Sequence, residues 1–253
     1  MNKRYDYMSQ IIVMASGKGG TGKSTVSAGI AVSLTKQGKN VLLIDCDCGM
    51  RGLDLMLGIE KNVVFDVSDV VCGNCDYSKA IYSAEDIPGL YLLPAPIDAA
   101  DEVSPAVMKQ ITDELKDNYD YILIDAPAGV GSSFDTAIEP AQKALIVVNA
   151  EPTSVRGCLN VRKKLTEKGI TDIRLIINRF NEKNFRTMGI YRDLDEVIDI
   201  CKTQLIGLVP DDIRIAALMQ SGCGKNCWSS AGVVFDSIVS RLMGVNVPLS
   251  FGM

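Results

Sequence analysis

A glycine-rich loop that directly follows an apolar run constrains this chain more than any other feature. The run at 10–15 reads QIIVMA, and residues 16–25 read SGKGGTGKST, a loop with two lysines. Residues 17–24 satisfy the pattern G-x-x-x-x-G-K-[ST], in which backbone N–H groups turn toward an anion between a strand and a helix. Residues 23–37 follow with apolar side chains at helical spacing, so both flanks are present. The pattern predicts a strand–loop–helix unit that binds phosphate, against the alternative of an ordinary glycine-rich turn.

Short apolar runs alternate with segments of helical period along the rest of the chain. Most of the runs are apolar on both faces, as strands of a parallel sheet are. Strands are predicted at 10–15, 40–45, 90–95, 121–125, 144–149, 174–178 and 205–209. Helices are predicted at 23–37, 105–118, 154–168, 194–201, 213–220 and 231–243, with Ser104 as the cap of the second. This alternation predicts an α/β fold: one doubly wound, mostly parallel sheet with helices on both faces, in a single domain spanning 1–253.

Composition excludes several classes of protein. The net charge of −5 gives no basic footprint for nucleic acid, and the chain has no histidine to serve as a general base or zinc ligand. Residues 1–10 contain no apolar stretch typical of a secretory signal, and no run reaches the length of a membrane-spanning helix. Eight cysteines in such a chain indicate reduced thiols. We therefore expect a cytoplasmic protein.

The loop residues have distinct expected roles. Lys23 would reach the β- and γ-phosphates of a nucleotide, and the Ser24 hydroxyl would bind Mg²⁺. The remaining loop contacts to the nucleotide are expected from Gly17, Lys18, Gly19, Gly20, Thr21, Gly22 and Thr25.

Three aspartates follow or end predicted strands. Asp45 and Asp47 lie in NVLLIDCDC, and Asp125 lies in YILIDAPAG. Because the carboxyl ends of parallel strands line the ligand crevice of an open sheet, these carboxylates are expected to converge on Mg²⁺ and the γ-phosphate. Asp45 and Asp125 would bind the metal, partly through water. The alternative is that each aspartate only caps a turn.

Four motifs together resemble the deviant Walker A ATPases of the ParA/MinD family, and most closely its MinD branch. The motifs are KGGTGKS at 18–24, DCDCGMRGLDLMLG at 45–58, DAPAG at 125–129 and NR at 178–179. The resemblance runs from about residue 11 to about residue 244. It implies hydrolysis of ATP to ADP and phosphate, dependence on Mg²⁺, and an ATP-driven homodimer that acts in spatial positioning of the division site or a related cargo. It also implies a partner or activator protein, which the sequence leaves unidentified.

The same resemblance assigns further roles to single residues. Lys18 would reach across to the nucleotide of a second protomer, which explains the second lysine of the loop; otherwise it is a solvated loop lysine. Asp47 would orient the attacking water. Asn178, followed by Arg179, would read adenine, although a buried asparagine that caps a turn is an equally familiar arrangement. The loop that contains Pro210 and Asp211 would pack beside the base.

Two segments directly follow the acidic strand ends, at 49–52 and 126–129. They resemble switch segments that order around a γ-phosphate and relax on hydrolysis. The alternative is that they are plain crevice loops.

The C-terminal part of the chain departs from the MinD branch, whose members typically end in a basic amphipathic helix. Here the end reads RLMGVNVPLSFGM, with Arg241 as its one cation and Pro248 in the tail. We therefore do not expect membrane attachment by that route, and any membrane contact would be peripheral, at the inner face.

The cysteines allow an alternative function. Cys72 and Cys75 form one closely spaced pair, and Cys223 and Cys227 form another. Four thiolates at these positions would suit a zinc ion or an iron–sulfur cluster, as in a metallocentre or iron–sulfur maturation ATPase. Free thiols are the simpler interpretation.

Overall fold

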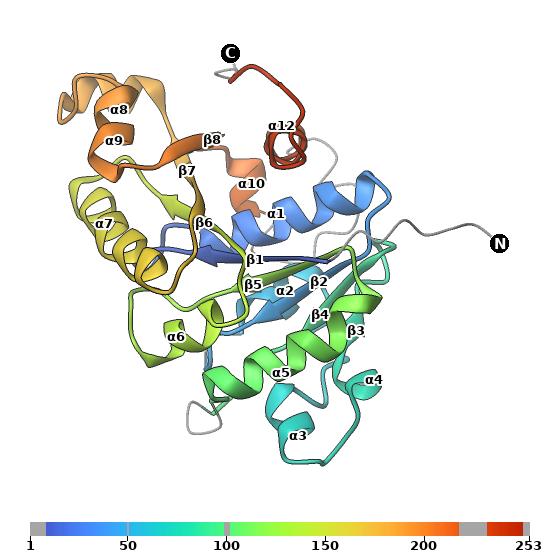
Figure 1. Cartoon of the computed structure of the whole chain (residues 1–253). Helices are drawn as coiled ribbons and strands as arrows, with labels where there is room; N and C mark the ends of the chain where they lie inside the picture. Colours follow the sequence, from blue (N-terminus) through green and yellow to red (C-terminus); the bar gives the residue numbers. More distant parts are fainter. Residues whose placement is uncertain (1–8, 50, 99–101, 218–231, 250–253) are drawn as a thin grey trace.

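An eight-stranded sheet organises the chain (Figure 1), and its strand order is β3-β4-β2-β5-β1-β6-β7-β8. The computed structural model describes residues 9–49, 51–98, 102–217 and 232–249. All neighbouring strands are parallel except β3 and β4. The strands are β1 (Gln10–Ala15), β2 (Val41–Asp45), β3 (Tyr82–Ser83), β4 (Leu90–Leu93), β5 (Tyr121–Asp125), β6 (Lys143–Val148), β7 (Asp172–Phe180) and β8 (Gln204–Pro210). The predicted fold class is thereby confirmed.

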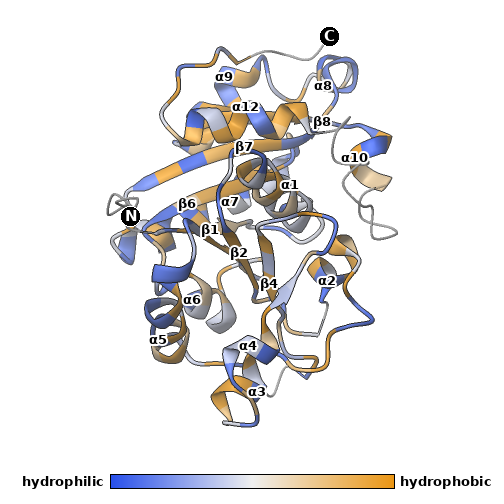
Figure 2. Cartoon of the chain, turned by 90° about the vertical axis from the view of Figure 1, so that its right-hand side faces the viewer, coloured by the Kyte–Doolittle hydropathy of each residue, from blue (hydrophilic) through white to orange (hydrophobic). Residues whose placement is uncertain are grey.

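The helices cover both faces of the sheet. They are α1 (Lys23–Lys36), α2 (Gly52–Leu57), α3 (Val67–Val71), α4 (Tyr77–Ala80), α5 (Pro105–Leu115), α6 (Ser132–Ile138), α7 (Pro152–Glu167), α8 (Glu182–Met188), α9 (Leu194–Cys201), α10 (Ile213–Ala217) and α12 (Val233–Leu242). One apolar cluster joins the sheet to α1, α2, α10 and α12, and a second joins its other face to α5, α6, α7 and α9. In Figure 2, which is coloured by hydropathy, the central strands are largely hydrophobic. A sheet buried on both faces explains why its strands read as continuous apolar runs.

Strand prediction missed only the two-residue strand β3 among the described strands. A strand this short leaves no periodic signal, and β3 is set by its antiparallel pairing with β4. The Tyr82 hydroxyl anchors it by accepting hydrogen bonds from the backbone N–H groups of Val64 and Phe65, at 2.9 and 2.8 Å.

Helix prediction missed the short elements α2, α3, α4, α6 and α8. Each is seven residues or fewer, so the helical period has little length in which to show. The predicted helix at 105–118 ends at Leu115, and a 3₁₀ turn, Lys116–Asn118, continues it. Ser104 caps α5 as expected, and α7 begins at Pro152, two residues earlier than predicted. Residues 218–220 and 231 of the predicted helices lie outside the described residues.

Helix α12 packs tightly against α1 and β8, and two glycines make the space for it. A Cβ atom on Gly29 would lie 2.6 Å from the Phe235 ring, and one on Gly207 would lie 2.3 Å from Cγ1 of Ile238. Of the expected inward residues Val234, Ile238 and Leu242, only Ile238 is fully buried. Phe235 and Val239 are the other buried residues of α12, because the helix turns this face toward the glycines.

Arg241 holds the segment that follows α12. Its guanidinium donates hydrogen bonds to the carbonyl oxygens of Ile206 at 2.9 Å and Val247 at 2.8 Å, and also to that of Pro248. The one cation of the C-terminal stretch is therefore used inside the fold. In the part of the chain that the structure describes, no helix is both long and apolar enough to cross a bilayer.

Candidate nucleotide site

The carboxyl ends of β1, β2 and β5 bring the predicted site residues to one edge of the sheet. Asp45 and Asp125 are register partners at the ends of β2 and β5, and Met14 of β1 is the next partner of Asp125. The glycine-rich loop leaves β1 at this edge and enters α1 at Lys23. The convergence expected from strand ends is therefore present.

Asp125 is the centre of the buried contacts. It is fully buried, and its Oδ2 lies 2.8 Å from Nζ of Lys23 and accepts a 2.6 Å hydrogen bond from Oγ of Ser24. Its other oxygen, Oδ1, accepts a 2.6 Å hydrogen bond from Oγ of Ser27. Three side chains of the first turn and a half of α1 thus hold one carboxylate.

The second carboxylate, Asp45, lies beside the first in a protein interior. It is 2% exposed, and its Oδ1 accepts a 2.9 Å hydrogen bond from the backbone N–H of Asp47. Burial and the charge of Asp125 raise the pKa of Asp45 from 3.8 to about 7, because two like charges in a desolvated site are unfavourable. Burial likewise raises the pKa of Asp47, with Lys23 opposing the shift. The site therefore holds more negative charge than its lysine neutralises.

Cys46 and Cys48 flank Asp47. Burial, together with the neighbouring carboxylates, raises the pKa of Cys46 well above its usual range. Burial and the charge of Glu102 raise the pKa of Cys48 to about 11. Both cysteines are therefore neutral thiols near pH 7, and they lie beside the site without adding charge to it.

The donor set fits a triphosphate with a hard divalent cation. Beyond its ion pair, Nζ of Lys23 has no hydrogen-bond partner among the described residues, although it is buried, and Oγ1 of Thr21 is likewise buried without one. An ammonium has three N–H donors, so two remain for phosphate oxygens. Ser24 and the carboxylates of Asp45 and Asp125 offer only oxygen ligands, which Mg²⁺ prefers while keeping several waters.

Lys18 lies on the outer side of the loop and faces its own chain. Its Nζ is 2.8 Å from Oε2 of Glu151, the residue that precedes α7. Both side chains are about half exposed. Lys18 thus makes no contact with the buried carboxylates, and it is held by a surface ion pair of the kind that breaks readily.

The loop is positioned by two close contacts, one with the backbone of α7 and one with the side chain of Asn178. A Cβ atom on Gly17 would lie 2.3 Å from the carbonyl carbon of Gly157 in α7, and one on Gly157 would lie 2.9 Å from the carbonyl oxygen of Gly17. Gly22, the N-cap residue directly before α1, has a φ of +82°, and a Cβ there would lie 2.3 Å from Nδ2 of Asn178. Only glycine fits at these three positions without displacing a neighbour.

The predicted adenine residues gather at the ends of β7 and β8. Asn178 is buried, and its Nδ2 donates a 2.8 Å hydrogen bond to the carbonyl oxygen of Thr21 in the loop. Arg179 is exposed with a φ of +53°, while Pro210 pairs with Phe180 in the sheet register. The backbone N–H of Asp211 donates to the carbonyl oxygen of Phe180 at 3.0 Å. In this structure Asn178 anchors the loop through its Nδ2, and its role toward adenine stays a prediction.

The two predicted switch segments border the same edge. The backbone N–H of Gly129 donates to the carbonyl oxygen of Ser16 at 2.9 Å, and that of Gly49 donates to Pro96 at 3.2 Å. Arg51 has a φ of +34°, and its Nε lies 3.4 Å from Oδ2 of Asp54. Met50 lies outside the described residues.

The cysteine pairs do not form a metal centre within the described part of the chain. Cys72 is exposed at the end of α3, and Cys75 is partly buried. No group of three or more cysteine, aspartate or glutamate side chains is placed to hold a metal ion among the residues that the structure describes. Cys223 and Cys227 lie outside those residues.

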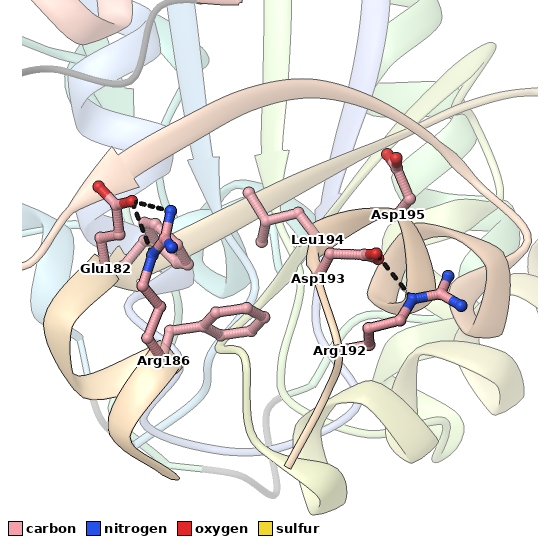
Figure 3. A pocket seen from close by; sticks show the side chains of 8 residues that line it. Glu182, Arg186, Arg192, Asp193, Leu194 and Asp195 are labelled. Carbon is pink, nitrogen blue, oxygen red and sulfur yellow. Dashed lines mark hydrogen bonds and ion pairs between the residues drawn. The ribbon is translucent and has the colours of Figure 1, made fainter. Parts of the chain in front are cut away.

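A separate cavity of about 430 Å³ lies between α8 and α9 (Figure 3). Arg186 and Glu182 pair on one rim, and Arg192 and Asp193 pair on the other. None of the side chains drawn there is a predicted site residue, so this cavity is distinct from the candidate nucleotide site.

Sequence reasoning missed three residues that the structure places at the site. Ser27 lies one helical turn after Lys23 and Ser24, a spacing that puts all three on one face of α1. Gly157 carried a signal, because a glycine inside a long helix costs about 1 kcal/mol relative to alanine and needs a packing reason. Glu151 carried none, since its contact with Lys18 joins residues 133 positions apart.

Comparisons with known proteins agree with this geometry. Residues 9–177 match the family of AAA domains. The septum site-determining protein MinD of Synechocystis sp. is 37% identical over 245 residues, which cover 95% of this chain and 92% of that protein. The septum site-determining protein MinD of Bacillus subtilis is 35% identical over 251 residues, covering 96% and 92%.

Solved structures are similar over the same length. A chain of the MinC:MinD cell division protein complex from Aquifex aeolicus is 36% identical with a TM-score of 0.87, covering 96% of this chain and 98% of that one. The septum site-determining protein MinD of Pyrococcus horikoshii, complexed with Mg-ADP, is 28% identical with a TM-score of 0.80, covering 93% and 96%.

Proposed function

The chain is a member of the ParA/MinD family of ATPases, and from this premise we propose that it is a Mg²⁺-dependent, ATP-driven dimerisation switch that acts in placement of the division site. The observation that carries the proposal is the contact set around Asp125. One buried carboxylate holds the lysine and the serine that the loop motif assigns to phosphate and metal.

Binding of ATP would exchange contacts within the protein for contacts to the nucleotide. Backbone N–H groups of residues 17–24 and the start of α1 supply the positive end of a helix dipole to the phosphates. Lys23 would turn its two free N–H donors to the β- and γ-phosphates while it keeps its ion pair with Asp125. Asn178 would stabilise the loop through the Thr21 carbonyl during this exchange.

Ser24, Asp45 and Asp125 would hold Mg²⁺, whose charge would neutralise that of the phosphate oxygens. Asp45 must lose its proton to take this part, and the raised pKa therefore predicts that metal binding releases a proton near neutral pH. Asp47 would orient a water for in-line attack on the γ-phosphate, leaving ADP and phosphate as products.

Lys18 would act on the nucleotide of a second protomer. Its ion pair with Glu151 lies at the surface, so the side chain can leave without uncovering a buried charge. A cation supplied by the partner would stabilise charge on the transferring phosphoryl group, as an arginine finger does. Dimerisation would then depend on ATP, and an unidentified partner protein would bind the dimer in preference to the monomer.

We further propose that the whole chain forms one domain and works in the cytoplasm. The names of the similar proteins, which concern division-site placement, support this function over the metallocentre alternative. That alternative would require Cys72 and Cys75 to meet two further thiolates.

The test is the mass of the Asp47→Ala variant in solution, measured by light scattering with ATP and Mg²⁺, with ADP and Mg²⁺, and without nucleotide. We expect a dimer with ATP only, and slow hydrolysis of ATP by the wild type without a second substrate. A variant that binds ATP but stays monomeric would refute the dimerisation switch. A stoichiometric metal bound by anaerobically purified protein, and lost in Cys72→Ala, would favour the metallocentre function.

A further inference from the structure

Ser27 makes a contact at the site that the loop motif does not include. The residue is fully buried in α1, one turn after Lys23. Its Oγ lies 2.6 Å from Oδ1 of Asp125 and 3.0 Å from the carbonyl oxygen of Lys23. A hydroxyl has one proton, and the shorter contact goes to the carboxylate, which is also the stronger acceptor. Ser27 therefore donates its proton to Asp125.

The two oxygens of Asp125 have different partners. Oδ2 contacts Lys23 and Ser24, the two side chains that turn to phosphate and metal when a nucleotide binds. Oδ1 contacts Ser27, which points into the protein and has no ligand to exchange with. When Ser24 turns to the metal, the Ser27 hydrogen bond is thus the hydroxyl contact that Asp125 keeps, beside its ion pair with Lys23.

We propose that Ser27 is a positioning residue for the metal: it fixes the rotation of the Asp125 carboxylate so that Oδ2 faces the metal and its water shell. The inference rests on the proposed function. Without the Ser27 hydroxyl, Oδ1 loses its donor in a buried site, and the carboxylate can rotate to share Oδ1 with Lys23 or Ser24. Partners in this second layer commonly change metal affinity tenfold or more.

The same helix provides a matched control in Ser33. That residue is 1% exposed, and its Oγ donates a 2.6 Å hydrogen bond to Oδ1 of Asp236 in α12. Ser27 and Ser33 are therefore both buried serines of α1 bonded to an aspartate at the same distance. They differ in where that aspartate lies: Asp125, which accepts from Ser27, is at the candidate nucleotide site, whereas Asp236 is not.

The experiment measures ADP affinity as a function of Mg²⁺ concentration for the wild type, Ser27→Ala and Ser33→Ala. We expect Ser27→Ala to need about tenfold more Mg²⁺ than the wild type to reach half of the full Mg²⁺-dependent increase in ADP affinity. Its ADP affinity in EDTA should stay within about twofold of that of the wild type. Ser33→Ala should lower the unfolding temperature to a similar extent and leave the Mg²⁺ dependence unchanged. Ser27→Cys, which keeps the side-chain shape and a weak donor, should lie between wild type and Ser27→Ala, and it replaces Ser27→Ala if that variant does not fold.

Three results would overturn the inference. The first is an unchanged Mg²⁺ dependence of ADP affinity in Ser27→Ala, or in Ser27→Cys where that variant replaces it. The second is an equal shift of the Mg²⁺ dependence in Ser33→Ala, which would show a general effect of loosening α1. The third is a wild type whose ADP binding does not respond to Mg²⁺ at all, a result that would also refute the proposed function. The first two results leave that function standing.

Discussion

The two ends of α1 bury polar groups in different ways. At its beginning, Lys23, Ser24 and Ser27 surround Asp125, yet Nζ of Lys23 lacks a hydrogen-bond partner among the described residues and the neighbouring Asp45 has a raised pKa. At its other end, Ser33 and Lys36 both contact Asp236, which is partly exposed to water.

The difference separates polar groups arranged for a ligand from polar groups arranged for packing. At the nucleotide edge, charge is crowded and incompletely paired, a costly arrangement that a bound cation and phosphates relieve. At the α12 end, the contacts are complete, and the glycines Gly29 and Gly207 let Phe235 and Ile238 pack closely. Substitutions at the first end should therefore change ligand binding, and substitutions at the second end should change stability.

The largest expected effect follows from Lys23→Ala. Removing the buried ammonium should weaken ATP binding about 100-fold, since charge-assisted hydrogen bonds contribute about 1.5–3 kcal/mol each. Isothermal titration calorimetry with ATP and Mg²⁺ would measure it. The matched control is Lys36→Ala at the other end of the helix, which should leave the affinity unchanged. Equal losses in both variants would show that the two ends do not differ in the way described.

Asp45→Asn should change the pH dependence of stability. The folded protein binds a proton at Asp45 with a pKa of about 7, against 3.8 for an ordinary aspartate, so wild-type stability falls as pH rises through this interval. Asparagine removes that loss, and the ligand-free variant should be more stable than wild type by up to about 4 kcal/mol at pH 8, with little difference at pH 4. Urea unfolding at several pH values measures it. A constant difference across pH would contradict the assignment.

Gly157→Ala should weaken nucleotide binding although the residue is not in the loop. The added methyl group would press on the backbone of Gly17 and displace the loop, and we expect about tenfold lower ATP affinity, or about 1.4 kcal/mol. The control is Gly207→Ala, which crowds Ile238 and should cost about 1–3 kcal/mol of stability without loss of affinity. Calorimetric titration and thermal unfolding of both variants would separate the two effects. A loss of affinity in Gly207→Ala would contradict the comparison.

Glu151→Gln should give the smallest effect. The exposed ion pair with Lys18 contributes about 0.2–1 kcal/mol, so its removal should free the lysine and shift ATP-dependent dimerisation to about two- to fivefold lower protein concentration. Sedimentation velocity in the Asp47→Ala background would detect this. Glu182→Gln, which breaks an exposed ion pair with Arg186 on α8, should have no such effect.

Much of the fold and part of the site followed from sequence. The seven longer strands and the convergence of Asp45 and Asp125 were predictable because a strand buried on both faces has a continuous apolar sequence and ends at a fixed edge. The contact of Lys18 with Glu151 was not predictable, because it depends on how α7 crosses over the sheet. The contact of Asn178 with the loop was not predictable for a similar reason: its amide suits either a base or a carbonyl, and the hydrogen bond to Thr21 depends on where the loop lies. Its role toward adenine stays a prediction.

The central claim is that this edge of the sheet serves nucleotides held by two chains, with Lys23 acting in its own chain and Lys18 in the partner. Mixing Lys18→Ala with Asp47→Ala tests it most directly, because each variant alone should be nearly inactive. In a mixed dimer, the nucleotide of the Lys18→Ala chain meets its own Asp47 and the partner's intact lysine, so one of two sites is complete. Random pairing at equal concentrations predicts about a quarter of the wild-type ATPase rate. A mixture that sediments as dimers and hydrolyses no faster than its components would contradict the account.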